Sequence, residues 1–217
     1  MKRFIAFMMM FILIFSLSGC RDKDAQAAST AAPATVAAAK PVIYLYPERV
    51  TDVSVSLDFN GTLTSTYPHY NDGWNVTAHP DGTLIDENGR EYYCLFWEGV
   101  QDVEYDFSHG FCVKGEDTAE FLEKTLSEIG LTDKEANEFI IYWLPKMEVN
   151  EYNLISFQSE IYTDNAQLTI SPSPDSLLRV FMAWKPIDKP AQIAPQTFEP
   201  FVREGFTVIE WGGSKIK

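Results

Sequence analysis

Two short phrases in this chain place a carboxylate beside a tryptophan, directly before or after it, and close to a glycine. They are LFWEG at 95–99 and VIEWGG at 208–213, and each ends an apolar, strand-like run. Glycoside hydrolysis needs two carboxyl groups, one protonated in an apolar setting and one ionised, and aromatic rings that stack on sugars. The phrases therefore suggest a carboxylate-dependent, glycosidase-like hydrolase. In it, Glu98 and Glu210 would be the catalytic pair, and Trp97 and Trp211 would bind the sugar.

The same residues have a simpler interpretation. A glutamate at a strand end usually meets water, and a tryptophan usually anchors a core. The sequence also contains no Gly-x-Ser-x-Gly elbow, His-Glu-x-x-His motif, phosphate-binding glycine loop or dinucleotide fingerprint. Whether the chain is an enzyme therefore stays open, a non-enzyme is favoured, and no cofactor is predicted.

A second set of candidates consists of aromatic residues near predicted strand ends. They are Tyr44, Tyr46, Tyr67, Tyr70 and Trp74. Rings presented with few polar groups suit the binding of a glycan, a wall polymer or a peptide segment. Packing in the core would also account for them, because aromatic side chains fill most protein interiors.

The residues that commonly bind metals are too scattered to predict a metal site. His69, His79 and His109 lie ten and thirty residues apart in separate loop regions, and none has helix or strand spacing to another. Cys94 and Cys112 are separated by seventeen residues of partly strand-like sequence. They can form a disulfide, or they can be two buried free thiols, and the sequence leaves both possibilities open.

Composition limits the class of protein and its partners. The 217 residues are 46% hydrophobic and 14% aromatic, which is enough for a real core. The formal net charge is −14, and an acidic surface repels both phosphate backbones and anionic headgroups. Nucleic acid is therefore not an expected partner, and a basic patch is not expected to attach the chain to a membrane.

The N-terminus has the pattern of an export signal. Lys2 and Arg3 precede an apolar run over 4–15, which is shorter than the roughly 20 residues of a transmembrane helix. Leu17-Ser18-Gly19-Cys20 follows and resembles the lipobox of bacterial lipoproteins. That resemblance implies a diacylglyceryl thioether on Cys20, which becomes the mature N-terminus and enters the lipid bilayer. It also implies a location in the cell envelope, on the extracytoplasmic face of a membrane.

These features predict three parts of the chain. Residues 1–19 are the signal peptide, and 20–40 are the lipidated cysteine with an Ala-rich flexible tether. Residues 41–217 are a single globular domain. The tether is predicted because the stretch after Cys20 is rich in Ala and has almost no large aliphatic side chain to bury.

Periodicity predicts an α+β fold, a mainly antiparallel β-sheet or sandwich with a two-helix hairpin inserted at about 117–144. Asn60-Gly61 predicts a hairpin between its flanking strands. Asp117 and Thr132, each followed three residues later by a glutamate, predict capped starts of the two helices, and Gly130 and Pro145 predict their ends. Strands are expected at 41–47, 51–59, 62–67, 74–79, 83–85, 91–98, 153–162, 166–170, 177–184 and 206–211, and a long loop at 185–200.

The stretches 40–47, 95–99 and 206–213 together resemble an uncharacterised family of secreted proteins. That resemblance implies no activity. The sequence thus predicts a membrane-anchored lipoprotein whose body is a binding or envelope-associated domain. Its partner would be a glycan, a cell-wall polymer, a peptide or an envelope protein. The alternatives are the hydrolase built on Glu98 and Glu210, and a structural or partner-docking lipoprotein.

Overall fold

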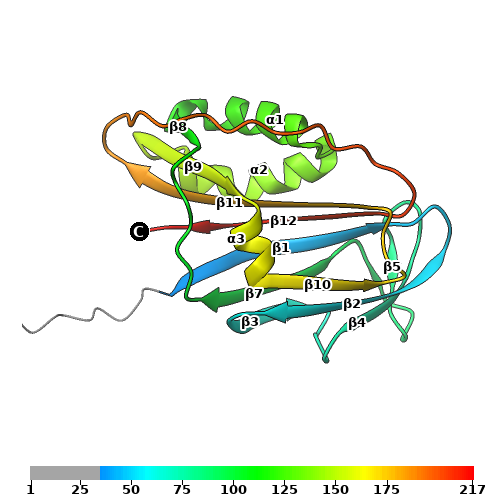
Figure 1. The fold of residues 1–217 in the computed structure, drawn as a ribbon. Coiled ribbons are helices and arrows are strands. Elements are labelled where there is room, and N and C mark those ends of the chain that lie inside the picture. The colour runs from blue at the N-terminus through cyan, green and yellow to red at the C-terminus, as the bar shows by residue number, and fades with distance from the viewer. Residues whose placement is uncertain (1–34) are drawn as a thin grey trace, which may run out of the picture. The chain divides into compact units, whose positions relative to one another are not determined.

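The structure is a computed structural model that describes residues 35–217. It has three layers: a pair of helices, a seven-stranded sheet and a five-stranded sheet (Figure 1). The predicted α+β class, with mainly antiparallel strands and an inserted helix pair, is confirmed. Predictions made for residues 1–34, among them the signal peptide and Cys20, lie outside the described residues.

The larger sheet contains β1 (Val36–Tyr46), β3 (Thr62–Tyr67), β7 (Leu95–Gln101), β8 (Phe111–Lys114), β9 (Tyr152–Gln158), β11 (Ser176–Ile187) and β12 (Thr207–Lys215). Its strand order is β3-β7-β1-β12-β11-β9-β8. The smaller sheet contains β2 (Thr51–Phe59), β4 (Trp74–Ala78), β5 (Leu84–Ile85), β6 (Glu91–Tyr92) and β10 (Ala166–Ser171). Its order is β10-β2-β4-β5-β6. Among these named strands, β11 and β12 form the one parallel pair.

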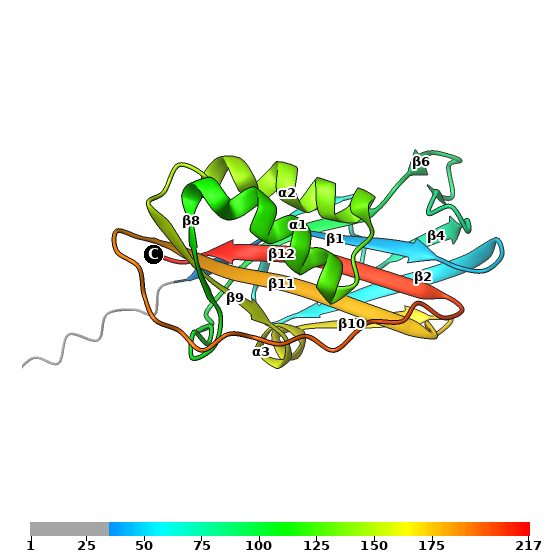
Figure 2. The same ribbon diagram turned by 90° about the horizontal axis from the view of Figure 1, so that it is seen from above.

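The helical hairpin consists of α1 (Thr118–Ile129) and α2 (Asp133–Met147), and it covers one face of the larger sheet (Figure 2). Gly130 ends α1 in the left-handed conformation, and Thr132 with Glu135 forms a capping box at the start of α2, as the sequence predicts. The start of α1 differs, because the Asp117 side chain makes no cap and a 3₁₀ turn (Gly115–Asp117) leads into the helix.

Pro145 does not stop α2 at Leu144, as the sequence predicts; the helix continues to Met147. A proline inside a helix deprives the carbonyl four residues earlier of its hydrogen bond. That carbonyl belongs to Ile141, whose side chain is 73% exposed on the outer face of α2. Water can reach this side of the helix, so the interruption is tolerated.

The hairpin predicted at Asn60-Gly61 is wrong. β2 belongs to the smaller sheet, whereas β3 pairs with β7 in the larger one. A two-residue type I′ hairpin needs positive φ at both central residues, and neither Asn60 nor Gly61 has it. Gly61 is required for another reason: a Cβ there would lie 2.4 Å from the carbonyl oxygen of Val100. The turn carries the chain from one sheet to the other.

Other predicted strand boundaries also differ. β11 continues to Ile187, inside the loop predicted at 185–200, β12 continues to Lys215, and β8 lies where no strand is predicted. The strand predicted at 91–98 is split into β6 and β7, which lie in different sheets. The strand predicted at 153–162 ends at Gln158, and α3 (Glu160–Asn165) follows. Tyr162 of α3 is fully buried and stacks on Phe181, so packing of this ring holds the short helix in place. β1 begins at Val36, inside the stretch predicted as tether.

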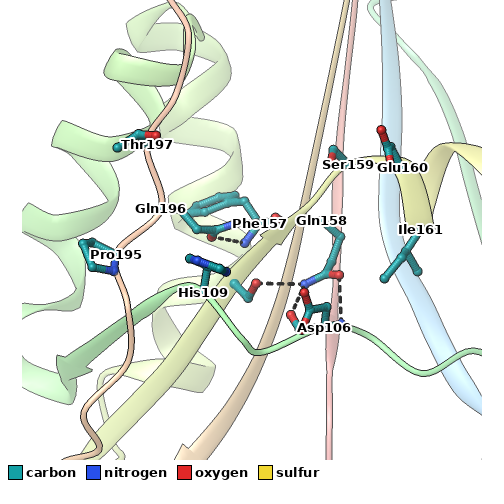
Figure 3. A pocket seen from close by; sticks show the side chains of 11 residues that line it. Asp106, His109, Phe157, Gln158, Ser159, Glu160, Ile161, Pro195, Gln196 and Thr197 are labelled. Carbon is teal, nitrogen blue, oxygen red and sulfur yellow. Dashed lines mark hydrogen bonds between the residues drawn. The ribbon is translucent and has the colours of Figure 1, made fainter.

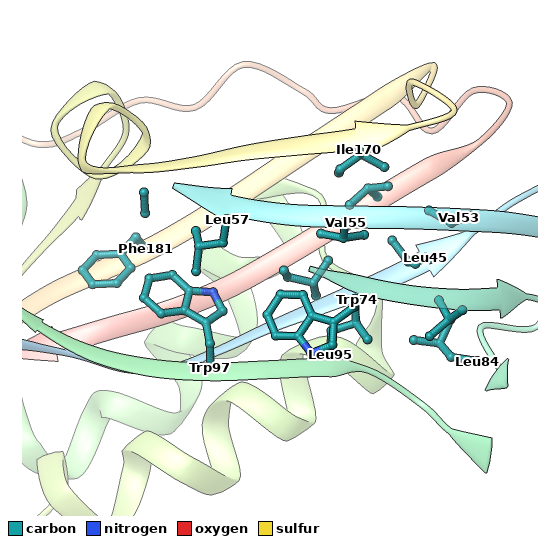
Figure 4. Close-up of a cluster of buried hydrophobic side chains, with 14 of the residues drawn as sticks. Leu45, Val53, Val55, Leu57, Trp74, Leu84, Leu95, Trp97, Ile170 and Phe181 are labelled. Carbon is teal, nitrogen blue, oxygen red and sulfur yellow. The ribbon is translucent and has the colours of Figure 1, made fainter. Parts of the chain in front are cut away.

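Two apolar clusters fill the spaces between the layers. The inter-sheet core contains side chains from both sheets, such as Leu45, Val55, Trp74, Leu95 and Trp97 (Figure 4). The helix-side core lies between the helices and the larger sheet and contains Phe139, Trp143, Trp184 and Trp211. Successive residues of a strand point to opposite faces, so the middle strands of the larger sheet supply both cores.

Candidate functional site

Glu98 and Glu210 lie on opposite faces of the larger sheet. Glu210 alternates with Trp211 along β12 and enters the inter-sheet core, where it is 0% exposed. Glu98 alternates with Trp97 along β7 and lies on the helix side. The two residues therefore cannot serve as the acid and base of one glycosidase site, which must face the same glycosidic bond. The predicted pairing is wrong because strand alternation separates the two glutamates.

Trp97 and Trp211 are not sugar platforms either. Both are 0% exposed, Trp97 in the inter-sheet core and Trp211 in the helix-side core. The glycines that follow these two tryptophans in the sequence, Gly99 and Gly212, allow close packing of neighbouring groups. A Cβ at Gly99 would lie 2.3 Å from the Phe59 ring, and a Cβ at Gly212 would lie 3.0 Å from Pro41. The simpler interpretation, in which the tryptophans anchor the core, is the one that the structure supports.

Glu210 is instead part of a buried polar network. Arg179 Nε donates to its Oε2 at 2.6 Å, and Trp97 Nε1 donates to its Oε1 at 3.1 Å. The Arg179 guanidinium lies 4.8 Å from the centre of the Tyr162 ring. Burial raises the pKa of Tyr162 well above its usual value, and the Glu210 charge adds to this. The network joins β7, β11, β12 and α3.

Of the five aromatic candidates, only Tyr67 is exposed, at 51%. Tyr44 and Trp74 are buried, and Tyr46 and Tyr70 are half-buried. The Tyr70 hydroxyl bonds to the backbone of Leu57, and the Trp74 indole donates to the carbonyl of Pro68, so these two have structural roles. Core packing accounts for most of this set.

Cys94 and Cys112 are free thiols and do not form a disulfide in the structure. Cys94 directly precedes β7, Cys112 lies on β8, and four strands of the larger sheet separate β7 from β8. At about 4.8 Å between neighbouring strands, the separation far exceeds the reach of a disulfide. Cys94 is buried, as in the alternative interpretation, and Cys112 is half-buried.

His109 lines a cavity of about 390 Å³ with Asp106, Gln158 and Glu160 (Figure 3). The neighbouring Ser108 hydroxyl lies between Asp106 and His109, at 2.7 Å and 3.0 Å. In a catalytic triad the histidine stands between the serine and the acid, and here the serine occupies the middle. Bonds from Ser108 also lower the pKa of Asp106, which makes that carboxylate a weaker base. This arrangement stabilises a loop and does not activate a nucleophile.

A more promising surface lies where α2 packs over Lys40 in β1 and over Tyr93, which precedes β7. A cavity of about 400 Å³, which we call the α2 groove, is lined by Lys40, Tyr93, Glu138, Ile141, Tyr142, Pro145 and Lys146. Tyr93 is 53% exposed and lies in the short segment that connects β6 in the smaller sheet to β7 in the larger sheet. Glu138, Tyr142 and Lys146 follow one another at four-residue spacing, which puts them on one stripe of α2. Glu98 borders the groove.

A bulge in β1 positions Lys40 at this groove. The register of β1 shifts between Ala38 and Val42, and Lys40 has φ 60°, a conformation uncommon for a residue other than glycine. The backbone N–H of Lys40 donates to Glu98 Oε1 at 3.1 Å, which helps to hold this conformation. Bulges and positive-φ residues often occur next to functional sites because they redirect a side chain.

The electrostatics of the groove combine both signs of charge. The Tyr44 hydroxyl donates to Glu138 Oε2 at 2.8 Å and accepts from Trp211 Nε1 at 3.2 Å, so Glu138 is tied to the helix-side core. Lys146 Nζ lies 3.6 Å from the centre of the Tyr142 ring. Burial lowers the pKa of Lys146, and Glu98 partly offsets this. Burial, with Glu98, raises the pKa of Tyr142.

The sequence singles out Glu98 and Tyr44, which contact Lys40 and Glu138, but none of the residues that line the groove. It predicts Lys40 as part of the tether and Tyr93 as part of a continuous strand. The 138–142–146 stripe could have been found, since it borders the buried stripe of α2 at helical spacing. Nothing in the sequence shows that this stripe meets Lys40 and Glu98, because that contact depends on how the helices dock on the sheet.

Comparison with known proteins adds a relative but no activity. A protein from Butyrivibrio fibrisolvens, described as "Uncharacterized protein in bglA 3'region", is 46% identical to this chain over 102 residues. The match covers 45% of this chain and 97% of that protein. This chain belongs to the same family. No family model and no solved structure matches it. In the described part, 35–217, no helix is long and apolar enough to span a membrane.

Proposed function

We propose that this protein is a lipid-anchored lipoprotein of the cell envelope that binds a peptide segment, free or part of a wall polymer, in the α2 groove. The observation that carries the proposal is the composition of that groove. Tyr93 and Tyr142 supply rings, and Lys40 and Lys146 supply ammonium groups. Glu138 supplies a carboxylate, and Glu98 adds a second at the border of the groove.

The anchor is inferred from the sequence. A cationic start, a short apolar run and Leu17-Ser18-Gly19-Cys20 have the order of a lipoprotein export signal. Two or more acyl chains hold a protein stably on a bilayer, whereas one chain gives only marginal binding. With a net charge of −14, the chain is unsuited to attachment through a basic surface.

Binding is favoured over catalysis by the state of the reactive groups at the groove. Cys94 lies beside Tyr93, Lys40 and Glu138, but burial raises the pKa of its thiol to about 12, so it is a poor nucleophile. Glu138 is held by the Tyr44 hydroxyl. The predicted partner of Glu98, Glu210, is on the other face of the sheet.

A peptide is favoured over a glycan because of the charges. A neutral sugar can stack on the tyrosine rings and form hydrogen bonds with the carboxylates and the ammonium groups, but it offers no opposite charge to either. A peptide that carries both a carboxylate and an amino group can pair with all four charged side chains. Such charge-assisted hydrogen bonds are about twice as strong as neutral ones.

Calorimetric titration of the full-length protein in detergent micelles tests this proposal. The probes are soluble muropeptides, which carry both sugar and peptide, and chitotetraose, a peptide-free glycan. We expect the muropeptides to bind more tightly. Glu138→Gln and Lys146→Met should each raise the Kd by about tenfold to a hundredfold, since a hydrogen bond to a charged group contributes about 1.5–3 kcal/mol.

Glu128→Gln and Lys124→Met are matched controls, because this exposed pair on α1 undergoes the same charge changes away from the groove. Both should leave the Kd unchanged. If neither probe binds, or if the control variants weaken binding as much as the groove variants, the peptide-binding proposal is wrong. The docking of an envelope protein would then be the better explanation of this surface.

A further inference from the structure

A larger cavity lies at a different place, where β1 begins and β12 ends. These two strand ends lie at the same end of the sheets (Figure 1). The cavity has a volume of about 1020 Å³, compared with about 400 Å³ for the α2 groove. We call it the end cavity. The loop after β7 forms one wall and the ends of β11 and β12 form another.

The floor of the end cavity is apolar. Val36, Val103, Phe107 and Ile216 line it, and each is half-buried against the inter-sheet core. The open end of the sandwich therefore exposes side chains that continue the core outward. Binding a nonpolar ligand removes such apolar surface from water, which is energetically favourable. An acyl chain bound here would pack against the side chains that border the inter-sheet core.

The rim of the end cavity carries three lysines, Lys185, Lys215 and Lys217. Lys185 Nζ lies 4.8 Å from the centre of the Phe107 ring, directly at the apolar floor, and Lys215 Nζ lies 5.2 Å from the Trp184 ring. Within residues 35–217, no carboxylate lies within 4 Å of any of these ammonium groups. They are free to pair with an anionic ligand group.

Acidic residues share this rim and must be considered. Asp106 is occupied, because its carboxylate accepts bonds from the backbone and hydroxyl of Ser108. Asp102 and Glu104 are exposed on the loop after β7. They flank Val103 of the floor and limit the positive charge of the rim. Lys185 still offers an ammonium group directly at the floor, with its Nζ 4.8 Å from the centre of the Phe107 ring.

We propose that the end cavity binds an amphiphile with an acyl chain and an anionic head. The chain lies on the floor formed by Val103, Phe107 and Ile216, and the carboxylate or phosphate head pairs with Lys185 and Lys217. This site is separate from the α2 groove and does not depend on it. Both a free fatty acid and a membrane phospholipid have this chemistry.

Photo-crosslinking of the full-length protein in phosphatidylcholine vesicles tests the site. The three probes are palmitic acid, hexadecanol and phosphatidylglycerol, and each carries a diazirine in a sixteen-carbon chain. Peptide mapping should find the palmitic acid or phosphatidylglycerol probe on the loop containing Val103 and Phe107 or on Ile216. Hexadecanol should label these positions about tenfold less, because it lacks the anionic head. The more strongly labelling anionic probe identifies the source of the ligand.

Two variants separate head from chain recognition. Lys185→Glu should reduce labelling by the anionic probes about tenfold and leave hexadecanol labelling unchanged. Val103→Asp should abolish labelling by all three probes, and an unchanged thermal midpoint would show that it folds. Lys124→Glu, on the exposed face of α1, is the matched control and should have no effect. Labelling outside the end cavity, or equal labelling by acid and alcohol, would overturn the proposal.

Discussion

Arg179 and Glu210 are the most tightly held charged residues of the inter-sheet core. Their side chains are 7% and 0% exposed, and they are paired across the parallel strands β11 and β12. Removing one charge of a buried pair leaves the other without compensation, which costs more than the pair itself contributes. The role of Glu210 is therefore to neutralise Arg179.

Glu210→Gln should lower the free energy of unfolding by about 3–5 kcal/mol, because it leaves the Arg179 charge buried and uncompensated. Urea denaturation of the full-length protein measures this change. Glu98→Gln is the matched control, because Glu98 is half-buried and a glutamine can still accept the hydrogen bond from the Lys40 backbone N–H. We expect it to change the free energy of unfolding by no more than about 1 kcal/mol. Equal effects of the two changes would contradict the assigned role.

Cys94 should resist alkylation in the folded protein. Burial raises the pKa of its thiol from 9.0 to about 12, so at pH 8 only about one molecule in ten thousand carries the reactive thiolate. Iodoacetamide labelling followed by mass spectrometry should show slow modification of Cys94 in buffer and fast modification in urea. Rapid labelling of Cys94 under native conditions would contradict its burial.

The raised pKa of the Cys94 thiol also predicts a pH dependence of stability. An unfolded Cys94 ionises near pH 9, and the folded residue ionises only near pH 12. The contribution of this thiol to the free energy of unfolding is therefore complete below pH 9, and it decreases as the pH rises from 9 towards 12. Cys94→Ala should remove this part of the alkaline dependence.

At the scale of elements, the turn at Asn60-Gly61 decides the topology. A hairpin there would place β2 and β3 in one sheet, but the chain crosses between sheets. The crossing brings the backbone of Gly61 against Val100 of β7 and against the Phe59 ring. This close approach requires a residue without a side chain.

Gly61→Ala should destabilise the protein by about 1–3 kcal/mol, because its Cβ would lie 2.4 Å from a backbone oxygen that cannot move without disturbing β7. Thr64→Ala, on the exposed face of β3, is the control and should change stability by no more than about 0.5 kcal/mol. Thermal denaturation of both variants measures the difference. A neutral Gly61→Ala would argue against the close approach.

At the scale of the whole molecule, the three layers give the protein two separate surfaces for which we propose binding roles. The α2 groove lies over the larger sheet, and the end cavity lies where β1 begins. β1 connects the body to the N-terminal residues that are predicted to carry the lipid anchor. Anchoring and binding would then depend on different parts of the chain.

Cys20→Ser should release the protein from membranes, because serine cannot form the thioether that the lipobox resemblance implies. Sedimentation of membranes followed by immunoblotting measures the distribution. Cys112→Ser, in the body, is the matched control and should leave the protein in the membrane fraction. If Cys20→Ser sediments as the unchanged protein does, the lipoprotein proposal is wrong.

The sequence alone determined the local structure of this protein well. The alternation at 51–59 predicted β2 with its observed bounds, and Thr132, Glu135 and Gly130 predicted the helix caps. These features depend on contacts between residues close together in the chain, such as a capping box or a pleated strand with one buried face. The α+β class follows from the same local patterns.

Only the tertiary structure decided which residues come together. Strand alternation and sheet order place Glu98 and Glu210 on opposite faces of the larger sheet. Cys94 directly precedes β7 and Cys112 lies on β8, and four strands separate β7 from β8. The α2 groove brings Lys40 and Glu138 together, and Glu98 is bonded to the backbone of Lys40, although the three residues are far apart in sequence. Such contacts depend on how helices and sheets pack, because burial of apolar area is non-directional and does not specify partners in advance.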